Sequence, residues 1–162
     1  DHRDLHSFPT RRSSDLPPVE YDSDNFDSFL SRAMDRINTM GDKERQSISM
    51  RFKDAMKYSF SLFRDDAFRK PKVNKNRNPV NKALFETTAI AIDSHIGTIK
   101  KINSLEFENV LKQVSKSITD SITEDKKFID SITQGTGDPA KIKYRFAFFS
   151  KALREALEYA MR

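Results

Sequence analysis

Helical spacing of apolar residues runs through most of this chain and constrains its fold more than any other feature. From Asp24 onward, apolar residues recur three or four positions apart, and no stretch alternates convincingly between apolar and polar residues. The glycines fall between these periodic segments, and the prolines mark loops and helix starts. The sequence therefore predicts an all-α domain, a compact bundle of about six helices with the last helix near its centre.

Each expected helix has one apolar face that is predicted to point into the core. In chain order these faces are Phe26, Phe29, Leu30, Ala33 and Ile37; Ile48, Phe52, Ala55, Met56, Ser59 and Phe63; Val80, Ala83, Leu84, Thr87, Ala91 and Ile92; Phe107, Val110, Leu111, Val114 and Ile118; Phe128, Ile129 and Ile132; and Ile142, Phe146, Phe149, Leu153, Ala156 and Ala160. The expected N-caps of the second, third, fourth and last helices are Asp42, Asn78, Ser104 and Asp138. The short connection at Gly41 predicts that the first two helices form a helical hairpin.

Residues 1–16 (DHRDLHSFPTRRSSDL) resemble a translated sequencing adapter at all sixteen positions. We therefore expect this segment to be non-native and disordered, and exclude it from inferences about fold and function. Residues 17–162 are expected to form one helical domain, and coding sequence upstream of them is expected to be missing. The segment contains three Arg and three Asp, so the formal net charge of +5 is unchanged without it.

Composition argues against several classes of active site. The chain has no cysteine, and His95 is the only histidine outside residues 1–16. A thiolate metal site, a cysteine nucleophile and a histidine-based catalytic group are therefore not expected. We predict no catalytic residues, no metal and no cofactor, no membrane-spanning segment, and a cytoplasmic location, which a cysteine-free chain fits.

A basic loop at residues 68–79 (FRKPKVNKNRNP) carries the strongest charge signal. The candidate nucleic-acid-binding residues in and beside it are Arg69, Lys70, Lys72, Lys75, Arg77 and Lys82. Spaced cations can bind phosphates and release counterions. By composition alone, however, an ordinary solvated loop is the favoured interpretation.

Two stretches resemble the helical C-terminal half of the GmrSD-type family. The first is Asn81–Glu86 (NKALFE), preceded by Phe68-Arg69-Lys70 and the basic loop, and the second is Phe128–Phe146 (FIDSITQGTGDPAKIKYRF). Members of this family have an N-terminal ParB/sulfiredoxin-like domain with a DGQQR-type motif, and no such string occurs here. The matching positions implicated in domain docking are Asn81, Phe85, Glu86, Thr136, Lys143 and Arg145.

The resemblance implies a helical accessory or scaffold domain without its own active site. Its expected partners are the missing ParB-like domain and DNA, in modification-dependent restriction or phage defence. The full-length parent would supply any nuclease or nucleotide-hydrolysing activity. Two other functions stay open from the residues alone: a free-standing nucleic-acid-binding helical module, and a structural bundle that binds other proteins. Near the start of the third helix, Glu86 could also pair with Lys143 or Arg145 of the last helix, but from the residues alone an ordinary capped helix is the favoured interpretation of this stretch.

Overall fold

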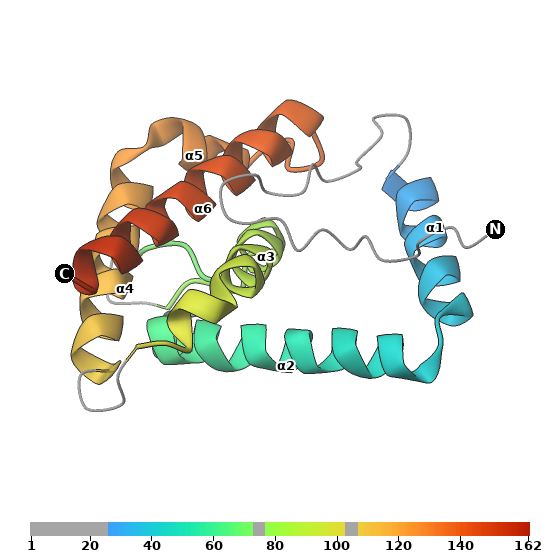
Figure 1. The fold of residues 1–162 in the computed structure, drawn as a ribbon. Coiled ribbons are helices and arrows are strands. Elements are labelled where there is room, and N and C mark those ends of the chain that lie inside the picture. The colour runs from blue at the N-terminus through green and yellow to red at the C-terminus, as the bar shows by residue number, and fades with distance from the viewer. Residues whose placement is uncertain (1–25, 73–76, 103–106) are drawn as a thin grey trace.

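The chain folds into α-helices joined by short loops, as a computed structural model shows for residues 26–72, 77–102 and 107–162 (Figure 1). The described elements are α1 (Phe26–Thr39), α2 (Asp42–Phe63), the 3-10 turn η1 (Arg64–Asp66), α3 (Lys82–Ile99), α4 (Phe107–Glu124), α5 (Lys126–Ser131) and α6 (Pro139–Ala160). Within these residues the only extended pairing is one antiparallel bridge between Arg69 and Val80. The predicted all-α bundle of about six helices is confirmed.

Helix α6 lies at the centre of the bundle, as predicted. It packs against α3, α4 and α5, while α2 covers α3 and part of α4 (Figure 1). Its expected inward residues Phe146, Phe149 and Leu153 are 5%, 1% and 0% exposed. Pro139 fits the first turn because its missing N–H would have no helical partner there. The faces predicted for α4 and α5 are also buried, apart from the half-buried Phe107 and Ile129.

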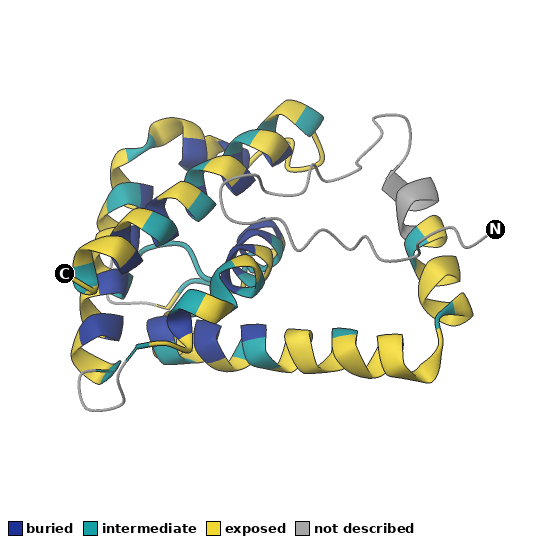
Figure 2. Cartoon of the chain, in the orientation of Figure 1, coloured by how far each residue is buried: buried dark blue, intermediate teal, exposed yellow. Residues whose placement is uncertain are grey.

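The face predicted for α2 is correct only in its second half. Ala55 and Ser59 are buried, together with Tyr58 and Leu62, which lie beside them on the helix. Phe52 was expected inside but is 54% exposed. The reason is tertiary: the first half of α2 projects beyond the other helices of the bundle, so its side chains meet solvent (Figure 2).

The predicted hairpin of the first two helices does not form. Helix α1 stands at the far end of α2 and turns away from it (Figure 1). The connection is held by Arg45, whose guanidinium donates to the Met40 carbonyl (2.8 Å), and by Glu44, whose carboxylate accepts from the Gly41 N–H (3.2 Å). Ile37, expected inside, is 45% exposed.

Helix α3 begins later and ends later than its sequence signals indicate. Asn78 and Pro79 were expected to start it, but Asn81 is the N-cap. The Asn78 amide instead donates to the carbonyls of Lys70 and Pro71 (3.0 Å each), and Val80, expected inside, lies in the bridge to Arg69 and is 55% exposed. Gly97 was expected between helices but lies inside α3.

The other predicted helix starts have mixed outcomes. Asp138 caps α6 as expected, whereas Gly41, not Asp42, occupies the N-cap position of α2. Ser104, the cap expected for the fourth helix, and residues 1–25 lie outside the described residues. In the described part of the chain, no helix combines the length and the apolar character needed to cross a membrane.

Candidate docking and nucleic-acid interface

Asn81 joins the start of α3 to the end of α5. Its side-chain oxygen accepts a hydrogen bond from the Leu84 N–H (2.8 Å), which satisfies one of the free donors in the first turn of α3. Its amide nitrogen donates to the Ile132 carbonyl (2.7 Å). One side chain therefore fixes both a helix start and a contact between distant parts of the sequence.

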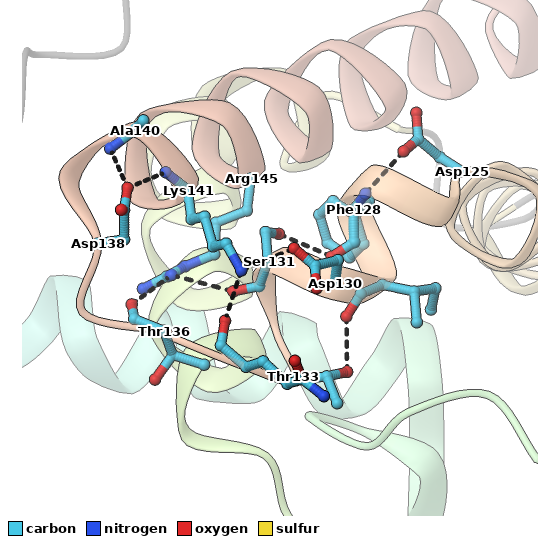
Figure 3. A network of polar contacts seen from close by, with 12 residues as sticks. Asp125, Phe128, Asp130, Ser131, Thr133, Thr136, Asp138, Ala140, Lys141 and Arg145 are labelled. Atoms are coloured by element: carbon cyan, nitrogen blue, oxygen red, sulfur yellow. Dashed lines mark hydrogen bonds and ion pairs between the residues drawn. The ribbon is translucent and has the colours of Figure 1, made fainter.

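Arg145 is a buried charged residue on α6, with 2% of its surface exposed. Its Nη1 donates to the carbonyl oxygens of Thr136 (2.7 Å) and Ser131 (3.3 Å). Its Nη2 lies 3.5 Å from a carboxylate oxygen of Glu86 on α3. In Figure 3 the side chain reaches from α6 toward the Ser131 and Thr136 carbonyls. Arg145 thus holds α3, α5 and the following turn against α6.

Burial and ion pairing act in opposite directions on this guanidinium. Removal from water lowers the pKa of Arg145, and the nearby Glu86 carboxylate opposes that shift. The group keeps its charge because an arginine pKa starts far above neutrality. Its Nε has no hydrogen-bond partner in the described part of the protein. The buried charge is therefore compensated through the two terminal nitrogens.

The turn between α5 and α6 has its own polar contacts (Figure 3). Asp138 caps α6 by accepting hydrogen bonds from the N–H groups of Ala140 (2.8 Å) and Lys141 (3.1 Å). The Lys141 ammonium donates to the Gln134 carbonyl (2.9 Å) and lies 2.7 Å from the Asp130 carboxylate. Gly135 has a φ of +55°, a value that glycine adopts without steric cost. These contacts hold the Thr136 carbonyl where Arg145 reaches it.

The two stretches that carry the family resemblance therefore meet in space. Asn81 and Glu86 of the first stretch contact Ile132 and Arg145 of the second. Of the two possible partners of Glu86 on the last helix, Arg145 forms the ion pair, whereas Lys143 is exposed to solvent. The polar groups of Asn81, Glu86 and Arg145 bind other residues of the same domain, around the start of α3 and the α5–α6 turn. Thr136 and Lys143 are the exposed members of the predicted docking set.

Phe85, also in the predicted docking set, makes an internal contact. Its ring meets the Phe68 ring edge-on, with 4.8 Å between the ring centroids. This geometry is the favourable one for aromatic pairs. Phe85 thereby ties the first turn of α3 to the chain segment that leaves η1.

The cations of the basic loop bind nearby groups of the loop and of η1. Arg69 donates to the carbonyls of Asp65 (3.2 Å) and Asn78, and Arg77 donates to the same Asp65 carbonyl (2.8 Å). Lys72 forms an ion pair with Asp66 (2.9 Å). Much of the predicted nucleic-acid set therefore already stabilises the loop. The Lys72–Asp66 pair is about half exposed, and exposed pairs contribute little to stability and can exchange partners.

The remaining members of that set lie apart from these contacts. The Lys70 ammonium donates to the Thr133 hydroxyl (2.9 Å), which connects the loop to the end of α5. Lys82 is exposed in the first turn of α3. Lys75 lies outside the described residues. Arg69, Lys70 and Lys72 are near neighbours in the sequence, and the Lys70–Thr133 and Arg69–Val80 contacts place this edge of the loop close to the Asn81–Arg145 network.

A pocket of about 250 Å³ opens beside this edge, and sequence reasoning gave no sign of it. Its lining includes Arg69, Lys70 and Lys72 from the loop, Thr88 from α3, and Phe149 from α6. It was missed because its walls combine the continuous 63–72 segment with residues of α3, α4 and α6. No spacing along the sequence could reveal that they converge.

Other interior polar groups could not be predicted either. Ser131 and Ile132 contribute their backbone carbonyls, which no side-chain pattern reports. His95 lies half-buried in α3, with its Nδ1 2.8 Å from the Ala91 carbonyl. Over residues 26–72, 77–102 and 107–162, no group of three His, Cys, Asp or Glu side chains is arranged to hold a metal ion.

Comparison of the chain with models of known protein families, with curated proteins and with solved structures finds no match. The contacts described above are therefore the basis for the functional proposals that follow.

Proposed function

We propose that this chain is a helical accessory domain of a GmrSD-type protein. It would act in the cytoplasm, in modification-dependent DNA restriction or phage defence, and would support a ParB-like domain that carries the reactive residues. The observation behind the proposal is the contact between the two resembling stretches through Asn81, Glu86 and Arg145. We call these three residues the clamp. A family signature whose residues bond to one another inside the domain is expected of a scaffold, because such residues stabilise the fold and do not react with a substrate.

The exposed residues around the clamp form the proposed docking surface. Thr136 and Lys143 project from the turn and the first half of α6, and Lys82 lies on the first turn of α3. The clamp fixes the backbone beneath them, so the surface is rigid before a partner binds. A pre-ordered surface loses less conformational freedom on binding, which favours affinity.

The gene is the first test of this function. Coding sequence upstream of residue 17 is expected to encode a ParB-like domain with a DGQQR-type motif. Its absence from the intact gene would refute the accessory-domain proposal. If it is present, the joined protein should cleave DNA or hydrolyse nucleotide, and residues 17–162 alone should do neither.

Association of the two parts then tests the docking surface. Lys143→Glu should weaken binding of the separately produced ParB-like domain, measured by co-purification and calorimetry. Lys151→Glu, a matched charge reversal at another exposed position of α6, should leave binding unchanged. Equal effects of the two variants would place the docking surface elsewhere.

A second candidate is a nucleic-acid-binding helical module. It is favoured by the grouping of Arg69, Lys70 and Lys72 along the pocket. Arg77 lies close to them, because it donates a hydrogen bond to the same Asp65 carbonyl as Arg69. Phosphates would replace acidic groups such as Asp66 as partners of these cations. Binding would then release counterions and fall steeply as salt is raised.

Salt dependence measures this candidate directly. The variant changes Lys70, Lys72, Arg77 and Lys82 to Gln, and it should lower the slope of log K against log salt concentration by about 1 for each phosphate that the variant no longer binds. The matched control changes four exposed lysines on α2 and α4 to Gln: Lys53, Lys57, Lys112 and Lys116. Equal slopes for the two variants would rule out the loop as the binding surface.

A protein-binding role has a separate observation in its favour. Apolar side chains are exposed along α1 and the projecting half of α2, where Met34, Met50 and Phe52 are 64%, 62% and 54% exposed. Cross-linking of the full chain with a partner protein at these residues, without nucleic acid, would support this role over the other two.

A further inference from the structure

We propose that the pocket beside Arg69, Lys70 and Lys72 binds a small anion with an aromatic body, of the nucleoside monophosphate class. The pocket lies between the end of α2, the loop after η1, the first half of α3 and the middle of α4. Its volume of about 250 Å³ is just below the usual range for ligand pockets, about 300–1,000 Å³. That size suits one ring system with one phosphate and excludes a dinucleotide.

The floor of the pocket is apolar and partly aromatic. Phe63 and Phe149 line it with ring centroids 6.5 Å apart and a tilt of 57°, and Leu84 and Ile122 complete the lining. Phe149, Leu84 and Ile122 are each at least 95% buried, so this wall is shaped by the core. Tilted rings offer both a face and an edge to a flat ligand, and both contacts are favourable for aromatic groups.

Thr88 supplies a polar group to the pocket wall. It is 2% exposed and lines the pocket, and its hydroxyl makes no hydrogen bond within the described residues. Its neighbour Thr87 differs, because the Thr87 hydroxyl donates to the Ala83 carbonyl (2.7 Å). Unlike Arg145 Nε, the Thr88 hydroxyl is not shut off from solvent, so it is an available donor at the pocket wall. A ring nitrogen or carbonyl of the ligand would satisfy it.

The mouth of the pocket is cationic. Lys70 and Lys72 line it with Arg69, and Asp66 is the acidic residue among the lining groups. Lys72 holds Asp66 at 2.9 Å in an exposed pair that a phosphate can replace, because a phosphate offers more acceptor oxygens. Apolar and aromatic lining residues, one hydroxyl at the wall and a group of cations together match a ligand with a ring at one end and an anion at the other.

Backbone strain at the mouth is a separate observation that points to the same place. Arg64, the first residue of η1, and Phe68, two residues after η1, have φ values of +49° and +61°. Bulky residues rarely adopt such values, and strain of this kind concentrates at ligand clamps. Phe68 is itself a lining residue, and the 69–72 segment that follows it also lines the pocket. None of these features depends on whether the chain belongs to a GmrSD-type protein.

Calorimetric titration of the full chain with adenosine 5′-monophosphate tests the proposal, with adenosine and inorganic phosphate as separate probes. The monophosphate should bind saturably and raise the melting temperature. Each fragment should bind at least about tenfold more weakly, because each offers only one of the two recognised ends. Binding of the monophosphate no tighter than that of phosphate alone would overturn the proposal.

Two substitutions locate the site. Thr88→Val keeps the side-chain shape and removes the hydroxyl, and Lys72→Gln removes a charge at the mouth; each should weaken binding about fivefold or more, while Lys112→Gln on the exposed face of α4 should not. Circular dichroism checks that each variant folds. Wild-type affinity in both pocket variants would refute this site. If a short single-stranded oligonucleotide displaces the monophosphate, the natural ligand is a nucleotide within a nucleic-acid strand. If the oligonucleotide does not compete, the natural ligand is a free nucleotide.

Discussion

Arg145 shows how a single buried charge connects segments that are distant in sequence. Its terminal nitrogens contact α3 through Glu86 and the α5–α6 connection through two backbone carbonyls. The sequence showed only that Glu86 could pair with the last helix, and an ordinary capped helix was the favoured interpretation. It could not choose between Lys143 and Arg145, because that choice depends on which face of α6 is buried.

Replacing Arg145 with Met is expected to lower the free energy of unfolding by about 3–5 kcal/mol, because the Glu86 carboxylate and two carbonyls lose their partner. Urea denaturation measures the change. Lys143→Met, on the exposed side of the same helix, should stay within about 0.5 kcal/mol of wild type. A decrease below about 1 kcal/mol for the Arg145 variant would show that the clamp is dispensable.

Tyr144 gives the fold a pH dependence at high pH. Its hydroxyl donates to Asp125 (2.8 Å), and burial followed by this hydrogen bond raises the pKa of Tyr144. The folded state therefore favours the protonated phenol, so this contribution is complete below pH of about 10 and is lost as pH rises through the raised pKa. Urea midpoints should fall more steeply above pH of about 10 in wild type than in Tyr144→Phe, and parallel curves would contradict this origin.

At the scale of elements, periodicity identified each helix, and local contacts then altered several boundaries and faces. Asparagine is a common helix cap, but the Asn78 side-chain amide donates hydrogen bonds to two carbonyls of the preceding loop. Asn78 therefore belongs to the loop, and α3 begins at Lys82. The α2 stripe is amphipathic along its whole length, yet only its second half has helices beside it (Figure 2). Periodicity shows which face can be buried, whereas neighbouring elements decide whether it is.

Core and projecting phenylalanines should respond differently to truncation. Phe146→Ala on α6 should cost about 3–5 kcal/mol of unfolding free energy, because the residue is 5% exposed and its removal leaves a cavity. Phe52→Ala on α2 should cost no more than about 0.5 kcal/mol, because the residue is 54% exposed. Similar decreases in urea denaturation would mean that the projecting half of α2 is covered in solution.

For the whole molecule, the same distribution of burial predicts uneven local stability. The helices α3, α4 and α6 share one core, whereas α1 and the first half of α2 have mostly exposed side chains in the described positions. Segments with few buried contacts open at low free-energy cost. The molecule therefore combines a stable bundle with an end that opens locally.

Amide hydrogen exchange read by mass spectrometry tests this difference. Residues 31–50 should exchange early, and the central parts of α3, α4 and α6 should exchange only with global unfolding. Peptides within α4 and α6 serve as internal controls, since both helices pack on each other. Equal protection of residues 31–50 and α6 would show that α1 and α2 are stabilised by association, for example with another copy of the chain.

Residue spacing was enough to establish that the chain is helical, where the breaks fall to within a few residues, and which faces of α4, α5 and α6 are apolar. These properties depend on neighbours three or four positions apart, which a sequence displays directly. Tertiary structure alone decided that α1 leaves α2, that Phe52 is exposed, that Arg145 takes the Glu86 carboxylate, and that a pocket forms beside Lys70. Each of those outcomes depends on contacts between segments whose separation in the sequence carries no information about their distance in space.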